Sequence, residues 1–285
     1  MPEWPGGARG ALCLSFDNLG EAAELELGAL SAAARLGEHL TARRVLPALL
    51  EALDEHGLAA TFFVEGLNAE LYPDALTGIA SSGHEVGYHA WRHEQWGELP
   101  AGEQAENLAR GVAAFQDLGL TVAGLRPPGG QLGRGGVGVL REAGLRYCSP
   151  AGEGAGVVGG IALLPFQWRH VDASSVLPPL GAVRKQMTGS ADPIEPGAFL
   201  AYLEGEIDRL SREGGFAAVV LHLFMLEWLG ERNLAALLSR LGEASRRGEL
   251  WIARCDEVAE HVLANGASFE ARTALDPTSW SSASA

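Results

Sequence analysis

Two histidines lie four residues apart after an apolar run, in the order His89-Ala90-Trp91-Arg92-His93. Imidazoles at this spacing can share one helical turn and face one divalent cation. Asn18, which follows the apolar run 11–16, could add an oxygen ligand. A single histidine is more often a packed or surface residue. The paired spacing nevertheless predicts a metal site made by His89, His93 and Asn18.

Asp17 precedes this asparagine and is a candidate general base for an attacking water. An Asp-Asn pair at a strand end is also typical of a turn or a helix cap. Arg126 opens the sequence Arg-Pro-Pro-Gly-Gly, which on the simplest interpretation is a rigid turn. We expect Arg126 to pair with Asp17 and to orient its carboxylate. Pro128 and Gly129 are expected on the substrate side of this turn.

His222 follows the apolar residues 219–221 and is a candidate general acid for a leaving nitrogen. A histidine in so apolar a run is otherwise a core residue. Trp168 and Asp172 follow another candidate strand and are predicted to line the substrate pocket, although Trp168 could belong to the core. A Ser-His-Asp mechanism has no support, because the sequence contains no Gly-x-Ser-x-Gly elbow.

The amino-acid composition of the chain argues against some classes of binding partner. The formal charge of -15 argues against nucleic acid and anionic membranes, which attract basic surfaces. Lys185 is the only lysine, which excludes most lysine-based covalent chemistry. The expected partner is a small-molecule substrate, and a homo-oligomer is left open.

The sequence also bears on the cellular compartment of the protein. Its three cysteines, Cys13, Cys148 and Cys255, cannot all pair, and each lies in an apolar context. Buried reduced thiols are the simplest interpretation, with a nucleophile or ligand as the alternative. Residues 1–10 lack the basic start and apolar stretch of a secretion signal, and no apolar run is long enough to cross a bilayer. A cytoplasmic location is therefore predicted.

Strand-like and helix-like segments alternate along the chain. Strands are expected at 11–16, 59–64, 85–89, 145–148, 161–166, 216–223 and 249–253, with Leu125 opening the Pro/Gly turn. Helices are expected at 39–56, 68–81, 101–118, 135–143, 195–212, 231–247 and 256–264. Residues 173–193 are predicted to form a long loop, and residues 276–285 a disordered tail.

This alternation predicts an α/β fold with parallel strands, because parallel strands need crossover helices. A barrel in one domain of residues 1–275 fits the length, with catalytic groups at the carboxyl ends of the strands. An open doubly wound sheet is the alternative. Its usual Gly-rich phosphate turn is absent after the first strand, where Asp17 is followed by Asn-Leu-Gly-Glu.

Taken together, these segments resemble the polysaccharide deacetylase superfamily, also called the NodB-homology group or carbohydrate esterase family four. The resemblance runs in order from about residue 11 to residue 262. Ser15-Phe16-Asp17-Asn18 is similar to the family's Thr-Phe-Asp-Asp motif, and His89 with His93 to its two-histidine motif. Residues 126–128 match Arg-x-Pro, and Leu221-His222 the late Leu-His motif. Residues 59–66 resemble the family's second strand.

The resemblance implies a distorted (β/α)7–8 barrel of NodB type. It also implies that Asp17 is the base, His222 the acid and Arg126 the residue that orients Asp17. His89 and His93 would hold a divalent metal, usually zinc, which polarises an amide carbonyl and the attacking water.

The chain departs from the family's motifs at two positions. Asn18 stands where the family has a metal-binding Asp, and Ala90 replaces the Ser or Thr after the first histidine. Residues 164–168 and 250–253 are closer to the cytoplasmic allantoinase-like and cyclic-imide-hydrolysing branch, some of whose members are thought to work without a metal. Leu223 stands where that branch usually has Pro.

The leading hypothesis is a hydrolase of a non-peptide C–N bond, a deacetylase or a cyclic amide or imide hydrolase, acting on a small molecule. Asp17 activates the water with or without a metal, and His222 protonates the leaving nitrogen. Two alternatives stay open. One is a degenerate deacetylase-like protein that only binds a ligand, and the other is a non-hydrolytic barrel enzyme of a biosynthetic pathway.

Overall fold

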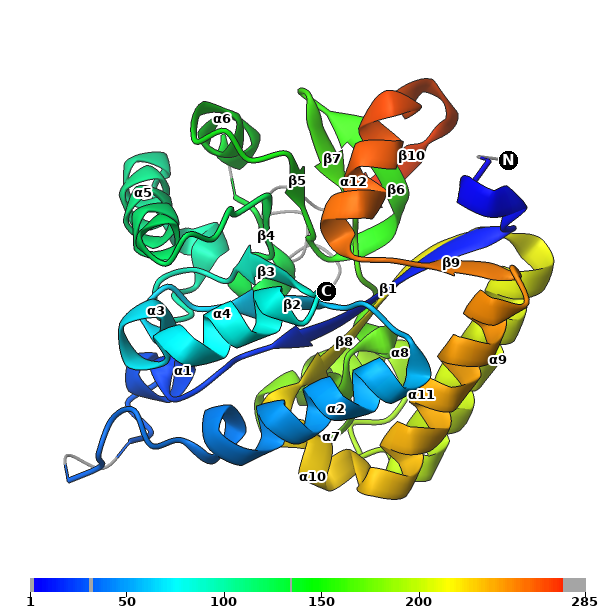
Figure 1. The fold of residues 1–285 in the computed structure, drawn as a ribbon, viewed down its shortest axis with the longest axis horizontal. Helices are drawn as coiled ribbons and strands as arrows, with labels where there is room; N and C mark the ends of the chain where they lie inside the picture. The colour runs from blue at the N-terminus through cyan, green and yellow to red at the C-terminus, as the bar shows by residue number, and fades with distance from the viewer. Residues whose placement is uncertain (1–2, 31–32, 134, 274–285) are drawn as a thin grey trace.

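The computed structural model describes residues 3–30, 33–133 and 135–273, which form a curled mixed sheet surrounded by helices (Figure 1). In these residues the strand order is β10-β6-β7-β5-β4-β3-β2-β1-β8, with β9 paired to the start of β1. Among the described strands, β10 and β8 at the ends of this order do not pair with each other to close the ring. The expected distorted barrel of NodB type is confirmed in this curled form. The strands are β1 (Gly10–Asp17), β2 (Thr61–Val64), β3 (Glu85–Tyr88), β4 (Gly124–Leu125), β5 (Tyr147–Cys148), β6 (Gly152–Val158), β7 (Ile161–Leu163), β8 (Gly215–His222), β9 (Leu250–Ile252) and β10 (Glu270–Thr273).

The helices cover the outside of this sheet (Figure 1). Most of the longer helices lie where the sequence predicts them, but the helix expected at 68–81 is two, because Tyr72 leaves the helical conformation before Pro73. The α-helices are α1 (Ala22–Glu26), α2 (Leu46–His56), α3 (Asn68–Leu71), α4 (Pro73–Ser81), α5 (Ala101–Asp117), α6 (Gly136–Glu142), α7 (Asp172–Val176), α8 (Gly181–Thr188), α9 (Pro196–Glu213), α10 (Leu226–Leu229), α11 (Glu231–Arg246) and α12 (Cys255–Ala264). A π-helix at Thr41–Val45 leads into α2.

Two expectations about the middle of the chain are wrong. The sheet is not all parallel, because β6 pairs antiparallel with β7 and β10 with β6. The β6–β7 turn is Gly159-Gly160 with both φ angles positive, which suits a tight hairpin. Gly-rich β6 lacks the apolar alternation that would reveal it in sequence. Residues 173–193 are not a long loop either, since most of α7 and all of α8 lie there.

Alternate side chains of each strand pack on opposite faces of the sheet. In β1, Leu12, Leu14 and Phe16 join the core beneath the outer helices, whereas Ala11 and Cys13 join a second core inside the curl. In β8, Ala218 and Val220 belong to the inner core. The same alternation continues to the carboxyl ends of both strands. Asp17 and His222 therefore lie on the inner face.

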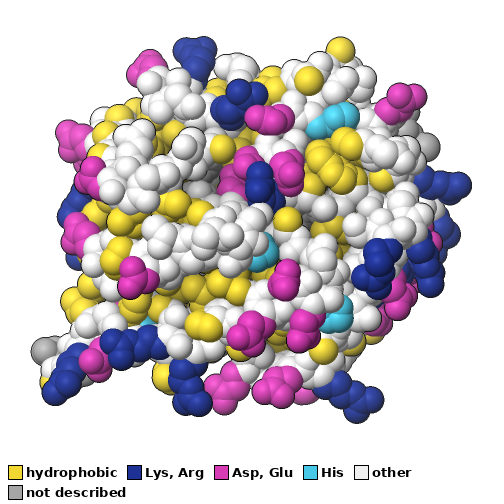
Figure 2. All heavy atoms as spheres, in the orientation of Figure 1, with side chains coloured by type: hydrophobic (Ala, Val, Ile, Leu, Met, Phe, Trp, Pro, Cys, Tyr) yellow, Lys and Arg dark blue, Asp and Glu magenta, His cyan; other side chains and the backbone are white. Residues whose placement is uncertain are grey.

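Acidic and basic side chains are interspersed over the face of the molecule in Figure 2. Among the described residues, no helix is long and apolar enough to span a bilayer. The boundary at residue 275 and the tail 276–285 lie outside the described residues.

Candidate active site

Polar side chains that follow six strands lie on the inner face of the curled sheet. Phe63, Tyr147 and Val220 belong to the inner core, and the residue two positions further along each strand keeps the same side. Carboxyl ends of parallel strands meet at one edge of a barrel, where enzymes of this architecture keep their catalytic groups. The residues placed there in this way are Asp17, Glu65, His89, Arg126, Ser149 and His222.

Asp17 and Arg126 form the buried ion pair that the sequence predicts. Arg126 Nη1 donates to Asp17 Oδ1 at 2.6 Å, and both side chains are almost fully buried. The same nitrogen donates to the Ser15 hydroxyl, and the other guanidinium nitrogens donate to the Ser149 hydroxyl. The guanidinium carbon lies 4.1 Å from the centre of the Phe63 ring. Arg126 is held on several sides, so it fixes the direction of the Asp17 carboxylate.

His222 is bound to Asp172, not to Asp17. Its Nδ1 lies 2.6 Å from Asp172 Oδ1, and its backbone N–H donates to Oδ2 at 2.8 Å. Burial lowers the pKa of His222, but the charge and hydrogen bond of Asp172 outweigh burial and raise it above 6.5. The Cα positions of His222 and Asp17 are register partners in the parallel β1–β8 ladder. An ionisable imidazole therefore lies beside the Asp17 carboxylate.

His89 and His93 come together, but not on a helical turn as the spacing suggests. They lie in a loop after β3 in which Ala90 and His93 adopt φ angles of 63° and 76°. A left-handed conformation breaks a helix and is strained for residues other than glycine. The loop still leaves the two ring centroids 4.9 Å apart at 72°.

The free nitrogens of this histidine pair can be assigned. His89 Nδ1 lies 2.8 Å from the Arg126 carbonyl, which can only accept, so Nδ1 carries the proton and Nε2 keeps a lone pair. That Nε2 lies 3.9 Å from Asp17 Oδ2. His93 Nδ1 is buried and has no hydrogen-bond partner among the residues that the structure describes. Burial lowers the pKa of each histidine to about 3, so both rings are neutral.

Glu65 is part of this site, although sequence reasoning did not single it out. Its side chain is fully buried, and its carboxyl oxygens accept from Asn18 Nδ2 at 2.5 Å and Asn68 Nδ2 at 3.0 Å. Burial raises the pKa of Glu65 to about 8. Asn18 has a φ of 60°, so a third left-handed residue lies at the site. The available signal was a glutamate directly after the buried Thr-Phe-Phe-Val strand.

The donors beside the two histidines could hold a divalent cation. A lone pair on His89 Nε2 and the unpartnered buried Nδ1 of His93 are the groups that a cation takes as ligands. Asn18 directs its amide nitrogen to Glu65, so its carbonyl oxygen is the free end of the side chain. Among the described residues, no three His, Cys, Asp or Glu side chains converge as a metal site. A cation would therefore rely on Asn18 for its oxygen.

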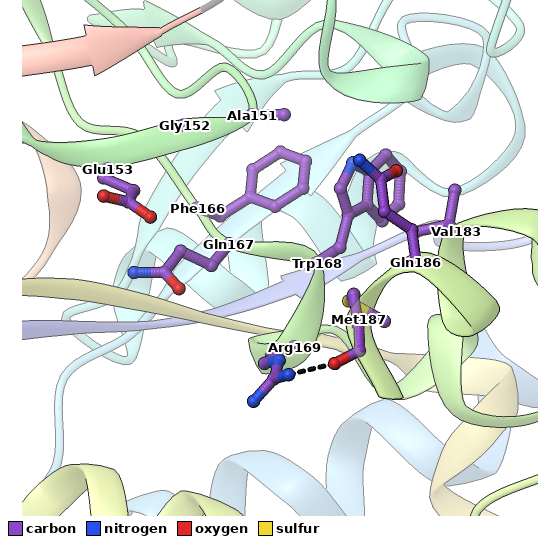
Figure 3. A pocket seen from close by; sticks show the side chains of 10 residues that line it. All are labelled: Ala151, Gly152, Glu153, Phe166, Gln167, Trp168, Arg169, Val183, Gln186 and Met187. Atoms are coloured by element: carbon purple, nitrogen blue, oxygen red, sulfur yellow. Dashed lines mark hydrogen bonds between the residues drawn. The ribbon is translucent and has the colours of Figure 1, made fainter. Parts of the chain in front are cut away.

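The residues expected to line a substrate pocket divide into two groups. Trp168 borders a pocket of about 260 Å³ with Phe166 and Gln186, whose side chains lie close to the indole in Figure 3. Phe166 also lies 5.4 Å from the Arg126 guanidinium carbon, so this pocket adjoins the site. Asp172 is fully buried, and its oxygens already accept from His222 and from the Ala173 backbone. The structure places it behind His222.

The turn after Arg126 forms one side of the same region. Pro128 is buried, and Gly129 is exposed with a φ of 74°. A Cβ at Gly130 would lie 3.0 Å from the Phe166 ring, so this glycine allows the turn to approach the pocket wall. The turn therefore links the buried arginine to the Phe166 pocket.

Comparisons with known proteins relate part of this chain to one family. Residues 36–148 match the family described as polysaccharide deacetylase, a stretch that includes Glu65, His89, His93 and Arg126. A peptidoglycan-N-acetylglucosamine deacetylase of Bacillus cereus is 31% identical over 87 residues, which are 30% of this chain and 32% of that protein. The chain thus aligns with about a third of the length of this curated relative.

Solved structures extend the likeness to nearly the whole chain. A Mycobacterium smegmatis protein assigned to the polysaccharide deacetylases superposes with a TM-score of 0.78 at 25% identity, covering 96% of both chains. The Puue allantoinase superposes with a TM-score of 0.71 at 19% identity, covering 92% of this chain and 93% of that one. At this lower identity the second match concerns the fold alone.

Proposed function

We propose that this chain, whose residues 36–148 match the polysaccharide deacetylase family, hydrolyses a non-peptide C–N bond of an acylated or cyclic amide. The observation that carries the proposal is the pairing of Asp17 with His222 across neighbouring parallel strands. Each of the two groups has its own buried partner, Arg126 for Asp17 and Asp172 for His222. This arrangement supplies a base and an acid on one edge of the barrel.

In the proposed reaction Asp17 takes a proton from the attacking water. Arg126, itself bound to the Ser15 and Ser149 hydroxyls, pairs with one oxygen of the carboxylate, Oδ1. The second oxygen, Oδ2, is the one that lies toward His89. Water attack on the amide carbonyl then gives a tetrahedral species whose C–N bond must break.

His222 protonates the leaving nitrogen in this scheme. Its Nδ1 is bound to Asp172, so Nε2 is the nitrogen that can deliver a proton. A raised pKa keeps more of the imidazole protonated near neutral pH, as a general acid requires. After proton delivery the C–N bond breaks and the amine leaves as a neutral product.

A divalent cation, zinc by analogy with the family, would be held by His89, His93 and the Asn18 carbonyl oxygen. When bound, such a cation polarises the substrate carbonyl. The proposed roles of Asp17 and His222 do not depend on it.

We favour a small, cytoplasmic substrate of the kind that allantoinase-like and cyclic-imide-hydrolysing members take. The pocket beside Phe166 and Trp168 is about 260 Å³, which suits one ring or a short side chain. Helix α8 contributes Val183, Gln186 and Met187 to its wall. The free, buried cysteines are compatible with a reducing compartment.

The test is a substrate panel. N-acetylglucosamine, its oligomers and five- and six-membered cyclic imides are incubated with wild-type protein and with Asp17→Asn as the blank, and released carboxylate and amine are measured. The proposal expects turnover of at least one monomeric substrate by wild type alone. Turnover confined to the oligomers would overturn the small-molecule assignment, and equal turnover by both proteins would overturn the role of Asp17.

A binding-only protein is the second candidate, and Asn18 favours it. An amide ligand brings no negative charge to a cation, so a site with Asn at this position holds metal more weakly than one with Asp. Calorimetric binding of a panel compound that wild type does not convert would support this candidate instead.

A further inference from the structure

We infer that Glu65 is a positioning residue for a divalent cation at His89 and His93. It orients the Asn18 amide and makes its carbonyl oxygen a stronger ligand. With a cation bound, the Glu65 carboxylate would supply the negative charge that Asn18 lacks, through its contact with the Asn18 amide. The inference concerns the cation site within the proposed function and does not depend on hydrolysis itself.

The first support is the contact between the two side chains. Asn18 Nδ2 donates to Glu65 Oε1 at 2.5 Å, and both residues are buried. An amide whose nitrogen faces the carboxyl group directs its carbonyl oxygen the other way. Asn68 Nδ2 donates to the second oxygen of Glu65 at 3.0 Å and also donates to the Leu19 carbonyl. The carboxyl group is therefore fixed from both sides, and it fixes Asn18 in turn.

The second support is the set of backbone hydrogen bonds that join the residues next to Glu65 to the loop that carries His89 and His93. The backbone N–H of Gly66 donates to the Ala90 carbonyl, and that of Leu67 donates to the Trp91 carbonyl. The N–H of His89 donates back to the Val64 carbonyl. Backbone hydrogen bonds on either side of Glu65 thus hold the His89–His93 loop against the end of β2. The Glu65 carboxyl group thus contacts Asn18, the proposed oxygen ligand. The residues next to Glu65 hold the loop that carries the two histidine ligands.

The third support is electrostatic. A carboxylate that accepts from an amide N–H shifts electron density toward the amide oxygen, as carboxylates behind zinc-bound histidines raise the basicity of the ring. Burial raises the pKa of Glu65 to about 8 and so disfavours this charge, whereas a bound dication would favour it. In a buried site the charge is little screened by water. A neutral set of two imidazoles and one amide would otherwise hold a dication without any compensating charge except that of the Arg126-paired Asp17. Glu65 is the buried acid in contact with that amide.

The simpler role for Glu65 is structural, as an acceptor that holds the turn at Asn68. A structural role and a role toward the cation differ in what Glu65→Gln should do. Glutamine keeps the size of the side chain and an oxygen that can accept from Asn18, but it carries no charge and loses the acceptor for Asn68 Nδ2. Asn68→Ala removes the same hydrogen bond and keeps the carboxyl group. A structural role therefore predicts equal cation affinities for the two folded variants, and a charge role predicts weaker binding by Glu65→Gln alone.

The test measures Zn²⁺ affinity of the full chain by chelator competition. Wild type should bind one Zn²⁺, and His89→Ala should lose it. Glu65→Gln should weaken the dissociation constant about 10- to 100-fold, the usual effect of losing a carboxylate behind a ligand. Asn18→Asp combined with Glu65→Gln should return the affinity to the wild-type value or better, because the charge then lies on the ligand itself.

Glu85→Gln is the matched control. Glu85 is also a buried glutamate of the sheet, but it lies at the other end of β3, where it accepts from Thr61, Tyr147 and the Asp256 backbone. Its substitution should leave Zn²⁺ affinity unchanged. Circular dichroism and melting show that each variant is folded.

Three results would overturn the inference. They are wild-type protein that binds no Zn²⁺, a Glu65→Gln variant that binds as tightly as wild type, and a double variant no better than Glu65→Gln alone. Zn²⁺ binding with these effects but no hydrolysis of any panel compound would count against the proposed function and leave the inference in place.

Discussion

One carboxylate, that of Asp172, holds His222 twice, through the imidazole Nδ1 at 2.6 Å and through the backbone N–H at 2.8 Å. The ring is therefore fixed both in its tautomer and in its direction. Asp172 lies at the start of α7, directly after Val171, which bridges to Val220 of β8. A residue predicted to touch substrate thus lies behind the candidate acid, and its effect should be measurable through that acid.

Asp172→Asn should shift the pH dependence of turnover. Asp172 raises the pKa of His222 against the opposing effect of burial, so its removal lowers that pKa. A general acid acts in its protonated form, and turnover falls as pH rises through its pKa. The alkaline limb of the kcat profile should move about one pH unit toward acid. Ser174→Ala, in the same helix but bonded to backbone carbonyls, should leave the limb in place.

The same pair makes a prediction for stability. A raised histidine pKa means that the folded protein favours the protonated ring, so this stabilisation is complete below about pH 6.5 and is lost as pH rises through the folded-state value. The free-energy difference between wild type and Asp172→Asn, measured by urea unfolding, should therefore shrink from pH 6 to pH 9. A difference that grows over this range would contradict the assigned direction.

Arg126→Met should destabilise the fold as well as reduce turnover. The substitution leaves the buried Asp17 carboxylate without its partner, which typically costs about 3–5 kcal/mol. Urea unfolding measures this loss. Adding Asp17→Asn removes the uncompensated charge, so the double variant should be more stable than the sum of the two single changes predicts. Strict additivity would mean that the two groups do not interact.

Two glycines test the packing on the outside of the sheet. A Cβ at Gly111 of α5 would lie 2.0–2.4 Å from atoms of the buried Tyr88 ring, whereas one at Gly205 of α9 would meet nothing within 4 Å. Gly111→Ala should therefore destabilise by about 1–3 kcal/mol. Gly205→Ala should stabilise by up to about 1 kcal/mol, because alanine favours a helix interior. Equal effects in thermal melting would refute the packing of Tyr88 against α5.

Much of the barrel could be predicted from local pattern. The strands that end in Asp17 and His222 are apolar runs with polar ends, and the long helices show apolar residues at helical spacing. The β6–β7 hairpin and α8 could not be predicted in this way. Gly-rich and Pro-rich residues there suggest a loop, and their regular structure depends on pairing and packing with distant parts of the chain.

The site residues likewise divide into those that the sequence could predict and those that it could not. Motif order was enough to select Asp17, Arg126 and His222, because each follows a strand-like run. The loop that carries His93 could not be foreseen, since a left-handed conformation at alanine or histidine has no sequence signal. Glu65 was missed because its importance comes from contacts with Asn18 and Asn68, which only the folded sheet brings together.

The most direct test of the central assignment compares Asp17→Asn and His222→Ala with wild type on the compound that the panel identifies. Loss of a general base or acid typically reduces turnover by about 10²- to 10⁴-fold. We expect a loss of this size in each variant, with Zn²⁺ content measured alongside and folding checked by melting. A turnover near the wild-type rate in either folded variant would contradict the assignment of base and acid to this pair of strands.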